Sequence, residues 1–224
     1  MREWGDAVVE IAGEMVTLCA ERAVYWQRRA TLLVADPHFG KAASFRALGV
    51  RVPRGTTGGA LKRLDALINR LAPARVVFLG DFLHAREGRN AETFDALAAW
   101  RASHASIEMQ LVRGNHDRHA GDPPSEVGIA CVDGPLLEAP FALAHHPRAV
   151  SGSYVLAGHV HPCAVLVGAG RQRERLPCFH FSHAVGVLPS FGEFTGCTEI
   201  EPGDADRVWV MAEGRVVLVP RPVR

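Results

Sequence analysis

Short apolar runs alternate with helical segments over the first half of the chain, and no other feature of the sequence restricts its fold as strongly. Residues 31–35, 75–79 and 107–112 are apolar runs with the length of a buried strand. Residues 56–71 place leucine and isoleucine on one face of a helix, and residues 91–101 are also expected to be helical. Neighbouring parallel strands must be joined by a crossover connection, which is usually a helix. The alternation of strands and helices therefore predicts a parallel sheet in an α/β fold.

The second half of the chain has a different character. After about residue 129, short strands separated by proline and glycine indicate a second, more antiparallel sheet packed on the first. A hairpin is expected earlier, at residues 15–19 and 23–26. No repeat or linker interrupts the sequence, so we expect a single domain over residues 1–224. The expected later strands are 129–132, 141–144, 154–157, 164–167, 177–181, 207–210 and 216–219.

Composition and charge exclude several classes of protein. Hydrophobic residues make up 48% and charged residues 22% of the 224 residues, which excludes disordered and fibrous chains. The formal net charge of +1 excludes a grossly basic nucleic-acid-binding protein, although a local basic groove is compatible with it. The five cysteines are scattered without a CxxC pair, so we expect reduced thiols and a cytoplasmic protein.

Neither a signal peptide nor a membrane segment is expected. The N-terminal region is acidic, with Glu3 and Asp6 where a signal peptide would carry basic and then apolar residues. Residues 149–170 carry no charged side chain, but they contain glycines, Pro162, His159 and His161. A lipid-facing helix tolerates such residues poorly, so we expect no contact with a membrane.

Polar side chains that bind metals recur just past the ends of the expected strands. In open α/β sheets ligands bind at the carboxyl ends of the strands, so these side chains are expected to meet at one edge. Taken singly, each group could be an ordinary turn or a structural pair; five groups in succession indicate a site. The residues are Asp36, His38, Asp81, His84, Asn115, His116, Asp117, His145, His146, His159 and His161.

The chemistry of this set points to two metal ions. Imidazole nitrogens and carboxylate oxygens suit Mn, Fe or Zn rather than Ca. One carboxylate can bridge two ions about 3.5–4 Å apart. Asp81, which follows Gly80 at the end of a buried strand, is the candidate bridge. His159 and His161 are two positions apart, so on an extended stretch both rings point the same way and can serve adjacent ions.

In this order, the motifs resemble those of the calcineurin-like metallophosphoesterase superfamily. The resemblance implies a four-layer α/β/β/α metallophosphoesterase sandwich of two mixed sheets with two divalent metal ions. It assigns one ion to Asp36, His38, Asp81 and His161, and the other to Asp81, Asn115, His145 and His159. The motifs that carry it are Asp36-x-His38, Gly80-Asp81, Gly114-Asn115-His116-Asp117, His145 and Gly158-His159-x-His161.

The resemblance also implies a mechanism. A hydroxide that bridges the two ions attacks phosphorus, while His116 contacts the phosphate and protonates the leaving oxygen, oriented by Asp117. We expect the ions to be Mn²⁺, with Fe or Zn as alternatives. Family patterns place the ligand directly after the strand, so His145 rather than His146 is expected to bind metal. His146 is then expected to contact substrate or to support the ligands.

Other segments resemble narrower groups. Residues 81–84, with the sequence Asp-Phe-Leu-His, are similar to an element of the SbcD-type DNA nucleases. This likeness implies that His84 lies beside the scissile phosphate; an ordinary surface or core histidine is the alternative. Residues 36–46, 52–57, 176–179 and 188–196 resemble the ligase-associated DNA damage response endonucleases, the PdeM group. That resemblance implies DNA hydrolysis in repair, with ligase-associated repair proteins as partners.

Basic residues follow several motifs and are candidates for contacts to a polyanion. Lys41 and Arg118 are the expected substrate-binding residues, and arginine is well matched to phosphate in geometry. The alternative is a compositional bias, because arginine replaces lysine almost throughout the sequence. The other candidates are Arg46, Arg51, Arg54, Arg86, Arg89, Arg113, Arg171, Arg173 and Arg175.

Three functions fit these patterns to different degrees. The first is a metal-dependent phosphodiesterase that acts on DNA, an endonuclease in DNA repair. The second is a phosphoesterase for a small substrate, such as a cyclic nucleotide phosphodiesterase or a nucleotide-lipid pyrophosphohydrolase. The third, a non-catalytic scaffold, has no use for His116 and Asp117. No long cap insertion separates residues 36 and 81, which favours an open site and therefore DNA.

Overall fold

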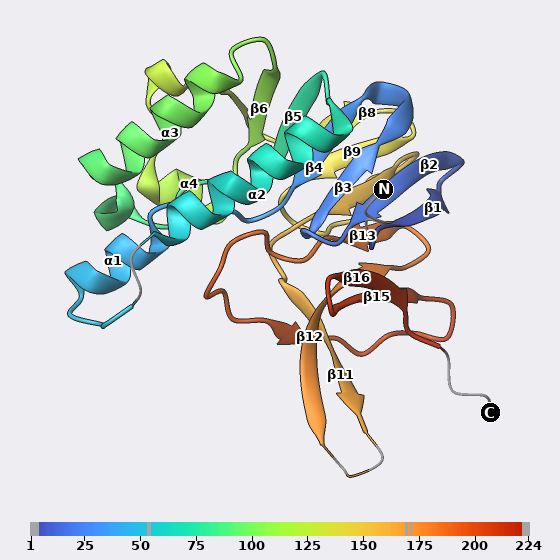
Figure 1. The fold of residues 1–224 in the computed structure, drawn as a ribbon. Coiled ribbons are helices and arrows are strands. Elements are labelled where there is room, and N and C mark those ends of the chain that lie inside the picture. The colour runs from blue at the N-terminus through green and yellow to red at the C-terminus, as the bar shows by residue number, and fades with distance from the viewer. Residues whose placement is uncertain (1–4, 53–54, 169, 171, 221–224) are drawn as a thin grey trace.

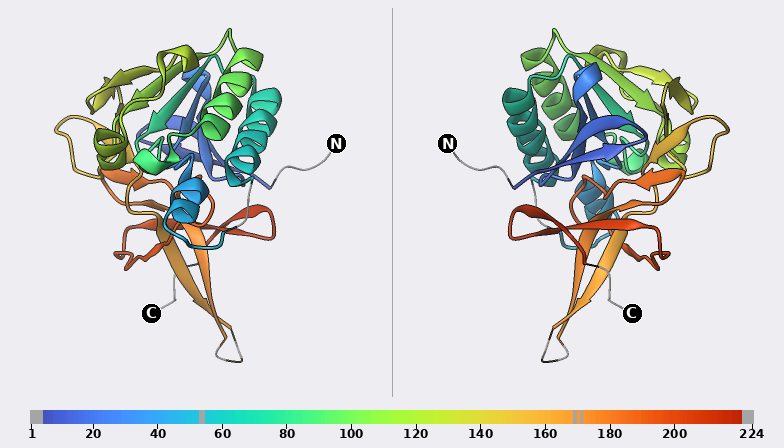
Figure 2. Two further views of the ribbon diagram at one scale, coloured as in Figure 1. Left: turned by 90° about the vertical axis from the view of Figure 1, so that its left-hand side faces the viewer. Right: turned by 90° about the vertical axis from the view of Figure 1, so that its right-hand side faces the viewer.

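The structure, a computed structural model, describes residues 5–52, 55–168, 170 and 172–220 and contains two sheets (Figure 1 and Figure 2). The first sheet is antiparallel from β1 to β4 and parallel from β4 to β7. The parallel half is the sheet that the alternation of strands and helices predicts. The hairpin expected at residues 15–19 and 23–26 is formed by β2 and β3. The strands are β1 (Ala7–Ile11), β2 (Glu14–Cys19), β3 (Ala23–Trp26), β4 (Thr31–Val34), β5 (Arg75–Leu79), β6 (Glu108–Val112) and β7 (Ala130–Val132).

The second sheet is mixed, with the strand order β14-β11-β12-β13-β10-β9-β8. Its centre is parallel, because β10 pairs with β9 and β13 in parallel, whereas β12 pairs antiparallel with β11, β13 and β15. The β11–β12 hairpin projects from the rest of the molecule (Figure 1). The strands are β8 (Leu136–Glu138), β9 (Phe141–Ala144), β10 (Tyr154–Ala157), β11 (Pro162–Val167), β12 (Arg173–Phe181), β13 (Val185–Val187), β14 (Thr198–Glu199), β15 (Arg207–Ala212) and β16 (Arg215–Leu218).

Helices cover the face of the first sheet that is turned away from the second. They are mainly α2 (Thr56–Leu71) and α3 (Ala91–Ser103), whereas the shorter α1 (Lys41–Ala47) and α4 (Asn115–Ala120) come just after the carboxyl ends of β4 and β6. α2 has the predicted bounds, and it buries Leu61, Leu64, Leu67 and Ile68 against the sheet. Among the described residues, no helix is long and apolar enough to cross a membrane.

The parallel strands are buried on both faces, which explains why they are continuous apolar runs. On β5, Val76 and Phe78 pack with the helices, whereas Val77 and Leu79 pack between the sheets. The core between the sheets also contains an edge-to-face contact between Trp26 and Phe141, with ring centroids 4.8 Å apart.

The α/β class and the sandwich of two mixed sheets are confirmed, and several details differ. The segment expected as strand 129–132 of the second sheet is β7, and it pairs in parallel with β6 at the edge of the first sheet. The short elements β1, α1, α4, β8, β13 and β14 had not been expected. In the described residues all α-helices precede residue 121, so the helical layer expected on the second sheet has no counterpart there. A small cluster of Ala142, Ala144, Val155 and Ala157 is buried on that face instead.

Candidate metal centre and active site

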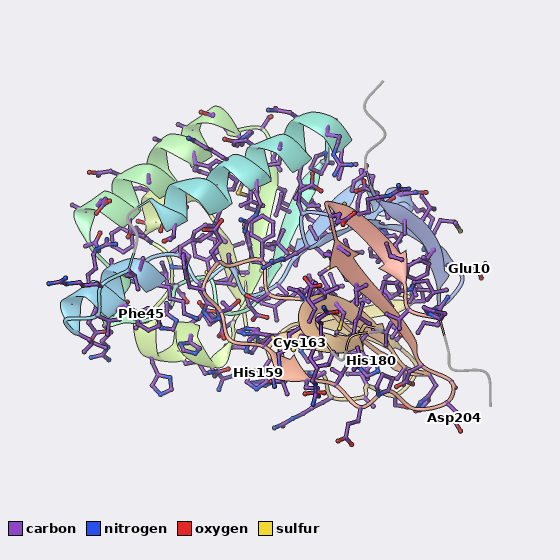
Figure 3. All side chains as sticks on the ribbon, turned by 60° about the horizontal axis from the view of Figure 1, so that its bottom comes forward. Glu10, Phe45, His159, Cys163, His180 and Asp204 are labelled. Carbon is purple, nitrogen blue, oxygen red and sulfur yellow. The ribbon has the colours of Figure 1, made fainter. Side chains whose placement is uncertain are left out.

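The loops that follow β4, β5, β6, β9 and β10 bring the predicted site residues to one edge of the two sheets. The first three connections belong to the first sheet: Asp36 and Asp81 lie on the loops, and Asn115 is the first residue of α4. The last two belong to the second sheet and carry His145 and the 159–161 segment. His159 is labelled on this edge in Figure 3. The site therefore combines side chains from both sheets of the sandwich.

Asp36, His38 and His161 form one group whose ligand atoms lie within 4.8 Å of one another. The Nε2 atoms of His38 and His161 are 3.4 Å apart, and His161 Nε2 is 3.5 Å from Asp36 Oδ2. His38 Nε2 also lies 4.0 Å from Asp81 Oδ2. These nitrogens and oxygens could hold one divalent ion.

His145 is the centre of a second group. Its Nε2 lies 2.9 Å from Asn115 Oδ1, 3.1 Å from His159 Nδ1 and 3.5 Å from Asp81 Oδ1. Its Nδ1 faces the carbonyl of Leu79 at 3.0 Å, which leaves Nε2 free to face the group. The two Asp81 oxygens thus face different groups, Oδ1 toward His145 and Oδ2 toward His38, as a bridging carboxylate requires.

His146 lies beside this second group. Its ring centroid is 4.3 Å from that of His159 and 4.7 Å from that of His145. His145, His146 and His159 also have ligand atoms within 4.8 Å of one another. Only His145 of the two neighbours is buried against both Asp36 and Asp81. This geometry favours His145 as the ligand, with His146 at the rim.

The backbone holds five of these residues in an unusual conformation. Asp36, His38, Asp81, His159 and His161 have φ between 48° and 70°. In the left-handed region a non-glycine residue costs about 1–3 kcal/mol, and such residues cluster at functional sites. The expectation of an extended stretch at 159–161 is therefore wrong. The two rings reach different groups because each residue turns the chain, not because a strand aligns them.

Glycines beside the site allow these turns and the close approach of neighbouring loops. Gly80 has φ of +81°, and a Cβ there would overlap the His145 ring. A Cβ at Gly158 would lie 2.5 Å from Asp36 Oδ2. A Cβ at Gly114 would overlap the Asp81 carboxylate. These glycines thus permit the separate loops to converge.

Replacement of Gly80 by alanine is expected to destabilise the protein and lower its metal content. Gly13→Ala is the matched control, because Gly13 has φ of +79° and no atom of the part of the chain that the structure describes lies within 4 Å of a Cβ there. The left-handed conformation alone costs about 1–2 kcal/mol in both variants. Overlap with His145 adds about 1–3 kcal/mol at Gly80. Urea unfolding and metal analysis measure both effects; equal losses in the two variants would contradict the packing explanation.

Burial sets the protonation of the site residues. It raises the pKa of Asp36 well above its usual range, and the nearby Asp81 carboxylate acts in the same direction. Burial lowers the pKa of His38, and it lowers the pKa of His145 to about 4. Asp36 Oδ1 and His38 Nδ1 are buried and have no hydrogen-bond partner among the described residues. A buried carboxylate among neutral imidazoles is a donor set that fits divalent cations.

His116 projects from the N-terminal turn of α4 into the same edge. Its Nδ1 lies 2.6 Å from the carbonyl oxygen of His84, and its backbone N–H donates to Asp81 Oδ1 at 2.9 Å. Its Nε2 is 4.0 Å from Asp81 Oδ2, and 37% of its side chain is exposed. The carbonyl contact favours a proton on Nδ1 and directs Nε2 toward the metal groups.

Asp117 does not contact the His116 ring in the way that had been expected. Its Oδ1 accepts from the backbone N–H groups of Phe82 and Leu83, at 2.9 and 3.3 Å, and its Oδ2 accepts from Gly114 N at 2.8 Å. It lies in the first turn of α4, so its short side chain reaches back to the helix N-terminus. Asp117 therefore links the 81–83 loop to Gly114 by hydrogen bonds. The His116 ring, which Asp117 was expected to orient, is instead oriented by the carbonyl of His84.

His84 lies inside the site rather than on a remote surface. Its ring centroid is 5.0 Å from that of His116, at an interplanar angle of 21°, and 5.2 Å from that of His38. The ligand atoms of His38, His84 and His116 lie within 4.8 Å of one another. Burial and the nearby Lys41 lower the pKa of His84 to about 4. A neutral ring at this position can contact a phosphate oxygen through an N–H.

Some of the candidate basic residues lie near the metal groups or are exposed, whereas others pair with nearby loops. Lys41, the first residue of α1, is half-buried near the acidic groups: burial lowers its pKa, and Asp81 and Asp36 oppose that shift. Arg118 is exposed and 3.9 Å from Asp133. Arg89 instead donates to the carbonyls of Gly121 and Asp122 after α4, and Arg113 pairs with Asp122 and with Asp133, which follows β7. Arg54 and Arg171 lie outside the described residues.

Two supporting groups had not been expected, because they act on or through the backbone. Ser190 Oγ donates to the carbonyl of Asp36 at 2.9 Å, and Gly192 N donates to the same oxygen at 3.1 Å. The carbonyl of Gly196 lies 3.2 Å from His161 Nδ1. Residues 188–196 thus hold the loops of Asp36 and His161 in place. The one acidic residue of this segment, Glu193, pairs with Arg63, and the segment's bonds to the site come from Ser190 Oγ and from backbone groups, which a side-chain pattern does not reveal.

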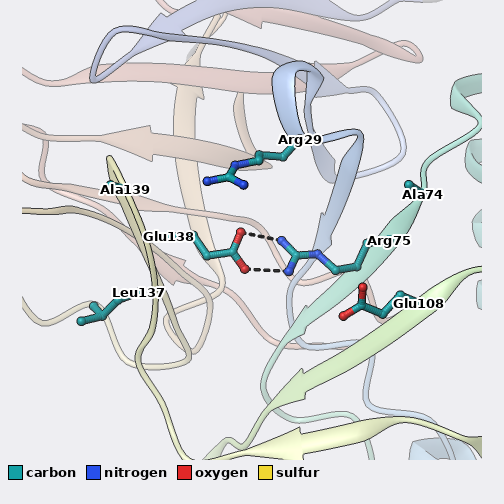
Figure 4. Close-up of a pocket in the computed structure, with 7 residues that line it drawn as sticks. All are labelled: Arg29, Ala74, Arg75, Glu108, Leu137, Glu138 and Ala139. Atoms are coloured by element: carbon teal, nitrogen blue, oxygen red, sulfur yellow. Dashed lines mark hydrogen bonds and ion pairs between the residues drawn. The ribbon is translucent and has the colours of Figure 1, made fainter.

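A hollow of about 480 Å³ lies elsewhere, near the first residues of β5 and β6 (Figure 4). It is thus at the opposite ends of the parallel strands from the metal groups. Arg75 crosses it to make a two-bonded ion pair with Glu138, at 2.6 Å for each bond. This pairing satisfies the charged groups at its centre, so the hollow is not the active site.

Comparisons with known proteins identify the family of the chain. The family model for calcineurin-like phosphoesterases matches residues 30–147, which is more than half of the chain. No curated protein matches the sequence. The crystal structure of Pseudomonas putida nuclease MPE is 44% identical, with a TM-score of 0.86, over 96% of this chain and 100% of that chain. The structure of the E. coli phosphoesterase Yfce is 14% identical over 82% and 88% of the two chains, with a TM-score of only 0.38. The chain belongs to the calcineurin-like phosphoesterases and is a metal-dependent phosphoester hydrolase.

Proposed function

We propose that this protein is a Mn²⁺-dependent DNA phosphodiesterase, an endonuclease that acts in DNA repair. The observation that carries the proposal is the paired arrangement of ligand atoms around Asp81, with His116 beside it. The likeness to a nuclease over nearly the whole chain supports a nucleic-acid substrate. The mixture of imidazole and carboxylate ligands supports Mn²⁺ over the harder Mg²⁺ and Ca²⁺.

The chain's own residues have separate tasks in this proposal. Asp36, His38, Asp81 and His161 hold one ion, and Asp81, Asn115, His145 and His159 hold the other. Two divalent ions, when bound, polarise the phosphoryl oxygens and supply a hydroxide nucleophile at neutral pH. His84 and Lys41 bind the phosphate, and His146 and Arg118 contact the substrate farther out.

His116 is the proposed general acid. Its imidazolium form donates the Nε2 proton to the leaving oxygen, and the neutral ring that remains keeps its proton on Nδ1. The His84 carbonyl, 2.6 Å from Nδ1, stabilises this tautomer before and after the transfer. Asp117 contributes by positioning, because it fastens the 81–83 loop to Gly114.

The exposure of the site favours a polymer over a small substrate. His159 is exposed and the His116 side chain is 37% exposed, so the metal groups open to solvent along one edge. A pocket for a small ligand buries most of that ligand. We place the activity in the cytoplasm, beside ligase-associated repair proteins, where the five free cysteines stay reduced. Hydrolysis of a cyclic nucleotide or a nucleotide-lipid is the alternative.

A substrate panel tests the proposal. Plasmid DNA, single-stranded DNA, cyclic nucleotides and bis(p-nitrophenyl) phosphate are incubated with the protein in Mn²⁺, Mg²⁺ or Zn²⁺. We expect Mn²⁺-dependent cleavage of both DNA forms or of the single strand, and an activity on DNA that decreases steeply with salt. Asp81→Ala, prepared in parallel, controls for contaminating nucleases. Hydrolysis of the small substrates alone would overturn the DNA proposal.

A further inference from the structure

Helix α1 brings an aromatic ring to the edge of the active site. The ring centroid of Phe45 is 5.7 Å from that of His84, at an interplanar angle of 71°. His84 is in turn stacked on His116, 5.0 Å away. Phe45, His84 and His116 therefore form a row of rings that leads outward from the metal groups. Figure 3 shows Phe45 beside α1, on the edge that also carries His159.

Phe45 does not have the environment of a core residue. Its side chain is only half-buried, and Phe45 belongs to none of the hydrophobic clusters formed by the described residues. Leu48 and Val50, which follow on the same segment, are 73% and 51% exposed. Exposed apolar residues such as Leu48 and Val50 are common on protein surfaces and need no ligand to explain them. Phe45 differs from them because its ring lies beside the His84 ring of the active site.

A cation accompanies this ring. Lys41 and Phe45 are four positions apart and so lie on one face of α1. The Nζ atom of Lys41 is 5.8 Å from the centroid of the Phe45 ring. Lys41 also lines a small hollow together with His38, so it lies beside the first group of ligand atoms as well as beside Phe45. A cation next to an aromatic ring suits a nucleotide, because the cation attracts the phosphate and the ring stacks with the base.

We propose that Phe45 is the base-stacking residue of the active site. The base of the nucleotide on the His116 side of the scissile phosphate stacks on Phe45, while Lys41 contacts the phosphate. The proposal rests on the proposed function, since it requires a nucleic-acid substrate. Stacking accepts every base, so Phe45 positions the nucleotide without reading its sequence. A core role for the ring predicts instead that its loss affects all substrates equally.

Cleavage of a modified single strand tests the proposal. One oligonucleotide carries normal bases throughout, and a second carries one abasic tetrahydrofuran nucleotide at a defined position. With Mn²⁺, the wild-type protein is expected to cleave one of the two bonds that flank the abasic nucleotide about 10-fold more slowly than the same bond in the normal strand. Phe45→Ala is expected to cleave that bond at the same slow rate in both strands.

Control variants separate stacking from folding. Phe45→Trp should keep the difference between the strands, and Leu48→Ala, which removes an exposed apolar side chain from the same segment, should behave as wild type. If Phe45→Ala slows both strands by the same factor, or neither, Phe45 does not stack on a base. If the wild-type protein cleaves neither strand while hydrolysing small phosphodiesters, the proposed function fails first, and this inference fails with it.

Binding provides a readout that is independent of cleavage. A strand with 2-aminopurine, whose fluorescence is quenched by stacking, is titrated into the Mn²⁺-loaded His116→Ala variant. We expect quenching on binding, and we expect Phe45→Ala in that background to remove the quenching and to weaken binding about 10-fold. Quenching that is unchanged by Phe45→Ala would overturn the proposal.

Discussion

His116→Ala is expected to lower kcat by about 10²–10⁴-fold, the range that a positioned general acid contributes. Metal content should stay near that of the wild-type protein. The His116 ring faces the site from 4.0 Å, but the two groups that include Asp36 with His161 and His145 with His159 do not contain it. Steady-state cleavage of single-stranded DNA, whose alkoxide leaving group needs the proton, measured beside metal analysis of the same sample, checks both parts.

His119→Ala is the matched control for that variant. His119 lies on the same short helix, is exposed, and places its Nδ1 2.7 Å from the carbonyl of Asn115. We expect activity close to that of the wild-type protein. Loss of metal together with activity in His116→Ala would mean that His116 is a ligand, as its grouping with His38 and His84 also permits. A substrate with a good leaving group should be affected less by His116→Ala than one with a poor leaving group.

Asp36→Asn is expected to have opposite effects on the metal-free and the Mn²⁺-loaded protein. Burial raises the pKa of Asp36, so the folded metal-free protein binds a proton that the unfolded chain has released. Stability due to this group is therefore present at low pH and is lost as pH rises from the unfolded pKa of about 4 toward the folded value. Asparagine carries no charge, so the metal-free variant should unfold at a higher temperature than the wild-type protein at pH 8.

With Mn²⁺ bound, the wild-type protein should unfold at a higher temperature than Asp36→Asn. Binding of the ion stabilises the wild-type protein by about 2.7 kcal/mol when Mn²⁺ is at 100 times its Kd, and the variant lacks one carboxylate ligand. Thermal unfolding at pH 8 with EDTA or with Mn²⁺ measures both effects. A variant that is less stable than the wild-type protein in both conditions would show that Asp36 stabilises the fold without metal.

Three histidines of the site make the stability of the metal-free protein depend on pH in the direction opposite to that of Asp36. Burial lowers the pKa of His38, and it lowers those of His84 and His145 to about 4, so the folded state binds fewer protons than the unfolded chain. Their contribution to stability is present above the unfolded pKa of about 6.5 and is lost as pH falls toward the folded values. Each group contributes at most about 1.4 kcal/mol per pH unit over that window.

Much of the fold could be predicted from the sequence, because the relevant patterns are long and local. α2 has the predicted bounds since sixteen residues give a clear periodicity with a buried face. The short elements were missed for the converse reason: β13 and β14 have three and two residues, which carry no detectable alternation. β7 was assigned to the wrong sheet because the composition of a strand does not say which edge it joins.

The candidate site could be predicted as a set of residues but not as a set of contacts. The order of Asp, Asn and His at strand ends was enough to collect the residues that the structure brings together. Their partners were less accessible, because several are backbone groups far away in sequence. Asp117 bonds to the N–H groups of residues 82, 83 and 114, and His116 to a carbonyl at position 84. No side-chain pattern reveals such partners.

The division of the site between the two sheets has a consequence for how the chain folds. The backbone N–H of His159 bonds to Asp36, a residue 123 positions earlier. Contacts between such distant positions form late in folding. Closing the long loop between them costs conformational entropy, and that cost comes before the contacts that offset it are made. A complete set of ligands therefore arises only when the second sheet docks on the first. Uptake of metal should then report the final step of folding, and a nascent chain that ends before residue 145 should hold no ion tightly.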